Sequence, residues 1–161
     1  MIHANIITGH GVQADESASL NNVNLGDGVA IGQRSTLFGS PRWPLEVGAG
    51  TRIGKHSILN GFAAPLRIGE RCSIGHFCHI IADTGPTASP PMLRLFPIRE
   101  QAITIGSDCW IGSGSMVIAG VTIGEGVVVQ PKSFVNSDLP PNCVAGGCPA
   151  RILGRTIPEE D

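Results

Sequence analysis

Aliphatic residues recur at every sixth position along most of this chain. The pattern is most regular in residues 105–135 and also occurs in three earlier stretches. The aliphatic positions are Leu25, Ile31, Leu37, Val47, Ile53, Leu59, Ile68, Ile74, Ile80, Ile105, Ile111, Val117, Ile123, Val129 and Val135. An α-helix repeats every 3.6 residues and a β-strand every 2, so neither produces a period of six. A fixed longer repeat is typical of a solenoid, whose stacked coils bury one continuous core.

Glycines and small residues accompany these aliphatic positions. A glycine often follows the aliphatic residue directly and a small residue often stands four positions after it, as Gly54 and Ser57 do after Ile53. We interpret each group of three hexads as a triangular coil of three short parallel strands. The aliphatic residue fills the interior, the small residue fits a tight corner, and glycine relieves the backbone in the turn. The pattern therefore predicts an all-β fold with a regular solenoid over residues 23–136.

Segments without the repeat interrupt or flank the solenoid. Residues 1–22 form an N-terminal segment of unassigned structure and role, and residues 137–161 form a short C-terminal extension. The longest insertion, residues 83–102, is rich in proline and carries several apolar side chains. A loop of this length in a regular solenoid is usually functional or an oligomer contact. Two shorter insertions lie at residues 39–46 and 64–67. We expect the whole chain of 161 residues to form one domain.

Composition and charge narrow the class of protein. Hydrophobic residues make up 42% of the chain and charged residues 15%, with 22 glycines and 12 prolines, which indicates a folded, turn-rich protein. The net charge of -2 provides no attraction for nucleic acid or an anionic membrane, so neither is expected as a partner. No apolar run is long enough to span a bilayer and no signal peptide is recognisable, which predicts a cytoplasmic location.

The cysteines are expected to be reduced. Their number, five, is odd, which argues against a disulfide framework. Cys72, Cys78 and Cys109 occupy the small-residue position of the repeat, where other hexads have Ser, Thr, Val or Ala. We therefore expect these three to be buried packing thiols, with no role as nucleophiles or metal ligands.

Three segments carry a resemblance to a known family: ITIGSDCWIG, GVTIGEGVVV and DLPPNCVAGGCPARIL. They resemble the hexapeptide-repeat acyltransferases, in particular the branch that contains the maltose, galactoside and polysaccharide O-acetyltransferases. The repeat covers residues 25–155, and the more specific likeness covers residues 105–155. The resemblance implies a left-handed parallel β-helix, with a long loop insertion and a short C-terminal extension, that assembles as a homotrimer.

The resemblance also implies a reaction. Acetyl-CoA would lie in a groove between neighbouring chains and donate its acetyl group to a hydroxyl of a sugar or polysaccharide precursor. In this family a histidine acts as general base on the acceptor hydroxyl, and no metal is required. The expected partners are CoA and a saccharide or other small-molecule acceptor. The identity of the acceptor, transfer to oxygen or nitrogen, and acetyl or longer acyl groups stay open.

The catalytic base departs from the family pattern. The family's histidine follows the coil before the large loop, and here that position is Gly85. The nearest histidines, His79 and His76, are the candidate bases, since imidazole titrates near neutral pH. A non-catalytic binding or assembly protein that has lost its base is the alternative. A metal-dependent carbonic anhydrase of the same fold is a further alternative, but the spacing of these histidines does not provide three converging ligands for zinc.

The resemblance suggests two groups of cofactor-binding residues. Trp110 and Ser113, with Gly114 beside them, match positions that border the pantetheine arm of CoA, although Trp110 is equally suited to anchor a subunit interface.

The other candidates are basic. Lys132 would act through charge toward the CoA phosphates or be solvated. Arg151 matches the family arginine near the adenosine 3′-phosphate, and Arg155 lies close to a second basic position. A guanidinium group suits phosphate because of its bidentate geometry. In the large loop, Arg94 and Arg99 are possible contacts for an anionic acceptor.

Overall fold

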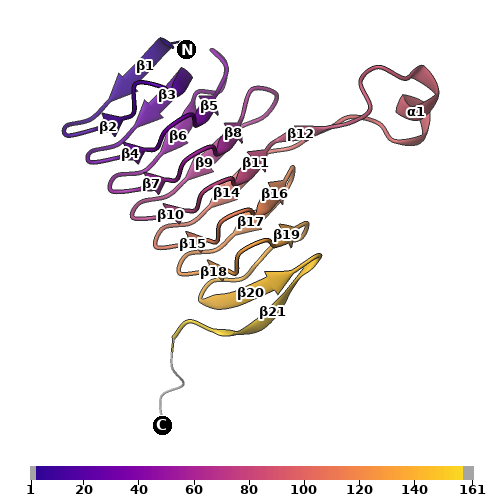
Figure 1. The fold of residues 1–161 in the computed structure, drawn as a ribbon. Helices are drawn as coiled ribbons and strands as arrows, with labels where there is room; N and C mark the ends of the chain where they lie inside the picture. Colours follow the sequence, from indigo (N-terminus) through magenta and orange to yellow (C-terminus); the bar gives the residue numbers. More distant parts are fainter. Residues whose placement is uncertain (1–2, 158–161) are drawn as a thin grey trace.

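The computed structural model describes residues 3–157, which form a long triangular prism of stacked coils (Figure 1). Each coil contributes one short strand to each of three faces, and strands of successive coils pair in parallel. The protein is a left-handed parallel β-helix, so the predicted fold class is confirmed. Among the described residues, no helix is long and apolar enough to cross a membrane.

We name the three faces A, B and C, and each is one column of paired strands. Face A contains β2 (Gln13–Ala14), β4 (Ala30–Ile31), β7 (Arg52–Ile53), β10 (Ser73–Ile74), β15 (Trp110–Ile111), β18 (Val128–Val129), β20 (Cys143–Gly147) and β21 (Ala150–Arg155). Face B contains the first half of β3 (Ser19–Leu25), β5 (Thr36–Phe38), β8 (Ile58–Asn60), β11 (His79–Ile81), β16 (Met116–Ile118) and β19 (Phe134–Val135). Face C contains the second half of β3, β6 (Leu45–Val47), β9 (Leu66–Ile68), β14 (Ile103–Ile105) and β17 (Thr122–Ile123).

The β-helix extends beyond both ends of the repeat that is visible in the sequence. β1 (His3–Thr8) pairs in parallel with β3, and β2 pairs in parallel with β4, so the unassigned N-terminal segment forms a further coil. Its hexad positions include Ala14, where later coils have isoleucine, and the aliphatic period is therefore hidden there. At the other end, β20 pairs in parallel with β18 before β21 returns antiparallel to it. Residues 1–2 and 158–161 of the two predicted terminal segments lie outside the described residues.

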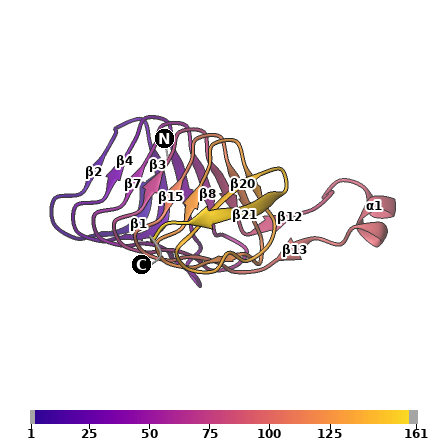
Figure 2. The same ribbon diagram turned by 90° about the horizontal axis from the view of Figure 1, so that it is seen from below.

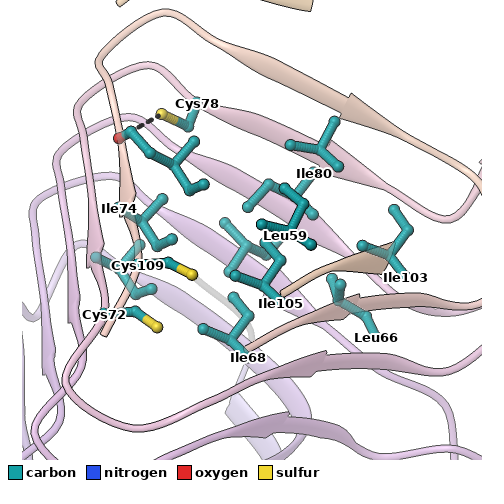
Figure 3. Close-up of a cluster of buried hydrophobic side chains, with 14 of the residues drawn as sticks. Leu59, Leu66, Ile68, Cys72, Ile74, Cys78, Ile80, Ile103, Ile105 and Cys109 are labelled. Carbon is teal, nitrogen blue, oxygen red and sulfur yellow. Dashed lines mark hydrogen bonds between the residues drawn. The ribbon is translucent and has the colours of Figure 1, made fainter. Parts of the chain in front are cut away.

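The inward aliphatic residues form one continuous core along the prism axis. All fifteen aliphatic positions of the repeat are buried, as the sequence pattern predicts. Figure 3 shows part of this column, in which Leu59, Ile80 and Ile105 come from three different coils. Burial of side chains such as these contributes roughly 1.5–3 kcal/mol each, so the column is the main source of stability.

Buried hydroxyls connect the coils at the corner between faces A and B. The Oγ of Ser57 donates a hydrogen bond to the carbonyl of Gly75 at 2.9 Å and accepts one from the N–H of Cys78 at 3.2 Å. Ser35 makes the equivalent contacts one coil earlier, with Gly54 and Ser57. A small polar residue is favoured here because it satisfies backbone groups that a buried turn would otherwise leave unpaired.

All three predicted insertions lie at the corner between faces B and C. The longest, which we call the arm (residues 83–102), projects away from the prism in both views (Figures 1 and 2). Its stem is the antiparallel pair β12 (Asp83–Thr84) and β13 (Arg99–Glu100), and its tip carries the short helix α1 (Pro90–Leu95). Leu95 and Phe96 at the tip are 67% and 65% exposed, so the arm has no apolar core of its own.

Glycine is required where coils stack most closely. A Cβ added at Gly106 would lie 2.6 Å from the backbone nitrogen of Glu125 in the next coil. Neither backbone can move away without breaking the parallel ladder, because Gly106 N–H donates to Ile123 O at 2.8 Å. The close spacing of the coils therefore requires a glycine after the inward aliphatic residue.

We predict that Gly106→Ala destabilises the fold by about 1–3 kcal/mol, because it overpacks two stacked backbones. Gly154→Ala is the matched control, since nothing lies within 4 Å of the added methyl group. The control should change the free energy of unfolding by no more than about 0.5 kcal/mol. Chemical denaturation followed by circular dichroism measures both, and equal midpoints for the two variants would contradict the steric argument.

Candidate functional site

A groove of about 760 Å³ runs along face A, over β2, β4, β7 and β10, and ends at β15. Its floor follows the glycines that come directly after the inward aliphatic residues, because a glycine presents no side chain. Its two walls are the outward positions on either side of that glycine stripe. One wall contains Arg52, Ser73 and Trp110, and the other contains Gln33, Lys55, His76 and Ser113. We call this the face A groove.

Coil stacking determines which side chains meet in the groove. Arg52 is paired in register with Ser73, and Ser73 with Trp110, so these three side chains form one outward column. The indole of Trp110 is 51% exposed at the end of that column. On the opposite wall, the N–H of His76 donates to Ser113 Oγ at 3.0 Å. Two of the predicted cofactor residues and one predicted base are therefore brought together.

A hydrogen bond fixes the tautomer of His76. Its Nδ1 accepts from the backbone N–H of Lys55 at 2.8 Å. A backbone N–H can only donate, so Nδ1 carries no proton and the neutral ring has its proton on Nε2. In this arrangement His76 presents the Nε2–H donor to the groove. To act as a base, it would have to lose the hydrogen bond from the Lys55 N–H or change tautomer.

The other predicted base, His79, lies on a different face. It begins β11 on face B, between Ile58 and Met116 of the neighbouring coils, and its side chain is half-buried. Within residues 3–157 its ring makes no hydrogen bond that would orient it. Trp110 points outward from face A, so it and His79 lie on different faces of one chain. The backbone of His79 nevertheless lies beside the turn that carries Ser113 and Gly114, because its N–H donates to the Ser115 carbonyl at 3.0 Å.

The family's histidine position is closed to any side chain. Gly85 follows β12 in the stem of the arm, opposite Ile98. A Cβ at position 85 would lie 2.7 Å from Ile98 Cγ1 and 2.9 Å from Ile98 Cα. An imidazole cannot be accommodated at this position while the stem keeps its packing.

The basic cofactor candidates also lie on or beside face A. The N–H of Lys132 donates to the Ser113 carbonyl at 2.9 Å, which places Lys132 one coil beyond Ser113. Gly114 has φ +75°, and its lack of a side chain leaves room for the Lys132 stem, whose Cγ would be 3.4 Å from an added Cβ. Arg151 and Arg155 are exposed on β21. From Trp110 to β21 the sheet advances three strand spacings, about 14 Å.

Four of the five free cysteines are buried, and Cys148 is exposed. The predicted burial of Cys72, Cys78 and Cys109 is confirmed. Figure 3 shows Cys72 and Cys109 close together in adjacent coils. Their contact raises the pKa of Cys109 far above the usual range and lowers the pKa of Cys72 to about 7. Burial raises the pKa of Cys78. In the part of the chain that the structure describes, no cluster of three or more His, Cys, Asp or Glu could hold a metal.

The sequence analysis missed Arg52, Lys55 and Gln33 as groove residues. Their signal is positional, because Arg52 stands one residue before the inward Ile53 and Lys55 stands two after it. When the hexads are aligned by their inward residues, Arg52 falls in the column of Trp110, and Gln33 and Lys55 fall in the column of Ser113. The inward residues of the repeat leave a regular pattern in the sequence, whereas the outward residues do not.

We predict that iodoacetamide labels one thiol of the native protein quickly, at Cys148. The other four should react only after denaturation, because accessibility limits alkylation even where, as at Cys72, the pKa favours the thiolate. Intact-mass spectrometry counts the adducts, and Cys148→Ser should abolish the fast one. Fast labelling of Cys72 in that variant would show that this corner of the prism opens in solution.

Comparison with known proteins identifies the repeat. Residues 102–137 match the model of the bacterial transferase hexapeptide family (six repeats). The structure resembles AntD, an N-acyltransferase from Bacillus cereus in complex with dTDP and 3-hydroxybutyryl-CoA, with a TM-score of 0.80 and 21% identity; the likeness covers 94% of this chain and 82% of that one. It also resembles the hexapeptide-repeat acetyltransferase VCA0836 of Vibrio cholerae complexed with acetyl-CoA, with a TM-score of 0.65 and 26% identity over 92% and 73% of the two chains.

Two curated relatives extend the likeness in sequence. The chain is 40% identical over 118 residues to the putative colanic acid biosynthesis acetyltransferase WcaF of Escherichia coli, covering 73% of this chain and 62% of the relative. It is 28% identical over 153 residues to the probable acetyltransferase Rv3034c of Mycobacterium tuberculosis, covering 92% and 49%. The chain thus spans less than two thirds of these relatives. The resemblance to the hexapeptide-repeat acyltransferases that the sequence motifs indicated is confirmed.

Proposed function

We propose that this protein is an acetyl-CoA-dependent O-acetyltransferase that acts on a hydroxyl of a sugar or polysaccharide precursor. The observation that carries the proposal is the arrangement of the cofactor candidates along one face. Trp110 and Ser113 lie at one end, Lys132 lies one coil further, and Arg151 lies on the last strand. This order corresponds to an extended cofactor with its thioester at Trp110 and its phosphates near the arginine.

Physical chemistry supports each of these positions. The exposed indole of Trp110 offers an apolar surface to the pantetheine arm, and Ser113 lies on the opposite wall of the groove. Lys132 and Arg151 are exposed cations suited to phosphate, and a guanidinium can bind it in bidentate fashion. Pro131, beside Lys132, has no N–H and cannot donate a backbone hydrogen bond to the cofactor, so side-chain charge has to supply more of the affinity.

The reaction requires a base that faces the thioester. The acceptor hydroxyl would attack the acyl carbon and lose its proton to a histidine. The histidine would return this proton to the sulfur when the carbon–sulfur bond breaks, so that CoA leaves as the thiol. His79 is on face B, so the His79 of one chain would serve the face A of a neighbouring chain. The homotrimer that the family resemblance implies would supply this neighbouring chain. His76, with its proton on Nε2, is placed to donate a hydrogen bond to the thioester oxygen, where negative charge develops.

A specific observation favours a second candidate function. Ile98 packs against Gly85 so closely that a side chain at position 85, where the family resemblance expects a histidine, would clash with it. A binding or assembly protein that kept the CoA face without catalysis would have this feature. The relatives named as acetyltransferases favour the enzyme. Transfer to oxygen, the acetyl group and the cytoplasmic location stay predictions, and AntD, an N-acyltransferase, shares the fold.

We predict that CoA binds to the full chain and that Arg151→Gln weakens this binding about tenfold, because one charge-assisted contact to phosphate is lost. Isothermal titration calorimetry measures the affinity. The matched control is Arg67→Gln, which removes a cation from face C, where Arg67 is paired with Glu46 at 2.9 Å. Failure of the unaltered protein to bind CoA would refute the acetyltransferase and favour the non-catalytic binding or assembly protein.

We predict that His79→Ala lowers acetyl-CoA turnover by about 100-fold or more over a panel of sugar acceptors, because it removes the general base. CoA affinity should change little, since His79 starts its strand on face B whereas Trp110 and Arg151 lie on face A. Thiol release measured with a chromogenic disulfide gives the rate. If His76→Ala abolishes turnover and His79→Ala does not, the base is His76. If the unaltered protein binds CoA without turnover, the non-catalytic function is supported.

A further inference from the structure

The N-terminal part of the face A groove has no role in the proposed reaction. The cofactor candidates extend from Trp110 toward the C-terminal end of face A, whereas the groove extends from Trp110 the other way, over β10, β7, β4 and β2. The two regions meet where Trp110, His76 and Ser113 lie together. A ligand in the groove would therefore present one end to the predicted position of the thioester.

Two cations without ion-pair partners line this part of the groove. Arg52 projects from β7, and Lys55 follows in the next turn. Neither forms a salt bridge within residues 3–157, whereas Arg67 and Arg71, on other parts of the prism, are paired with carboxylates. Unpaired cations that converge on a groove are typical of a site for an anionic ligand.

One carboxylate also lines the groove, and it is engaged locally. Asp15 accepts hydrogen bonds from the N–H and the Oγ of Ser17 at 2.9 and 2.6 Å. These bonds, with a smaller contribution from the charge of Lys55, keep the pKa of Asp15 below its ordinary value. The formal charge of the lining is therefore positive, with Arg52 and Lys55 against a single Asp15.

The remaining lining suits a sugar. Ser73 and Gln33 offer hydroxyl and amide groups to hydroxyls, and the exposed face of Trp110 can stack on a ring. The floor of glycines allows a ligand to approach the backbone closely. Arg52 and Trp110 are separated by two strand spacings, about 10 Å, which a phosphorylated hexose can bridge.

We propose that the face A groove binds the acceptor, and that this acceptor is a phosphate-bearing sugar whose phosphate lies between Arg52 and Lys55. Its free hydroxyl then reaches Trp110 and His76, beside the thioester. There the hydroxyl oxygen forms a bond to the acyl carbon and the carbon–sulfur bond breaks. The hydroxyl proton passes to the base and from the base to the CoA sulfur, so that CoA leaves as the thiol. The transfer of the acyl group to this acceptor rests on the proposed function, whereas the binding of a phosphate between Arg52 and Lys55 does not depend on it.

Calorimetric titration of the full chain tests the site, with inorganic diphosphate and glucose 1-phosphate as probes and glucose as the uncharged match. Both anions should bind and glucose should bind at least tenfold more weakly. Arg52→Gln and Lys55→Gln should each weaken anion binding about tenfold, as expected for the loss of a charge-assisted contact. Arg67→Gln on face C is the matched control and should leave the anion affinity within about twofold. CoA affinity should be unchanged in all three variants, which also shows that they are folded.

Several outcomes would overturn the assignment. If the two anions fail to bind, or bind equally well to Arg52→Gln and Lys55→Gln, the groove is not a phosphate site. If both variants lose CoA affinity, or if CoA displaces diphosphate competitively, the cations hold the cofactor and the acceptor lies elsewhere. Failure of the proposed function gives a different result, namely anion binding in a protein that does not bind CoA.

Discussion

The structure depends on one constraint, the parallel stacking of coils in register. Each strand donates and accepts backbone hydrogen bonds with the equivalent strand of the next coil, as when Gly54 N–H donates to Ile74 O and Gly75 N–H to Ile111 O, both at 2.8 Å. Equivalent residues must then lie one strand spacing apart, about 4.8 Å. Aliphatic residues meet aliphatic residues in the core, and a residue that crowds its successor, such as any side chain at position 106, is excluded. The period of six in the sequence is the consequence of this geometry.

The same register constructs the candidate site. Because Arg52, Ser73 and Trp110 hold equivalent outward positions, stacking places them in one column whatever the length of chain between them. The arm is inserted between Ser73 and Trp110 in sequence, yet the two are neighbours in face A, since the insertion leaves the prism at the opposite corner. A β-helix can therefore acquire loops without disturbing a site on another face.

The division of the chemistry between faces follows from the triangular section. His79 and Trp110 lie on different faces of the prism, B and A, although the backbone of His79 is hydrogen-bonded to the turn that carries Ser113. Position 85 in the arm offers no replacement, because Ile98 occupies the space of its side chain. His76 is the one predicted base that shares a groove with Trp110, and the backbone of Lys55 determines which of its nitrogens can donate.

The sequence by itself determined the solenoid, its buried aliphatic column and the burial of Cys72, Cys78 and Cys109, because inward positions are restricted by packing and leave a strong periodic signal. It also indicated the family and the residues expected at the cofactor. It did not reveal the N-terminal coil, where Ala14 takes the place of a larger aliphatic residue, or the groove built by Arg52 and Lys55. Outward residues are not restricted by the core, so their pattern is irregular. Only stacking in three dimensions decides which of them share a surface, and which nitrogen of His76 faces a ligand.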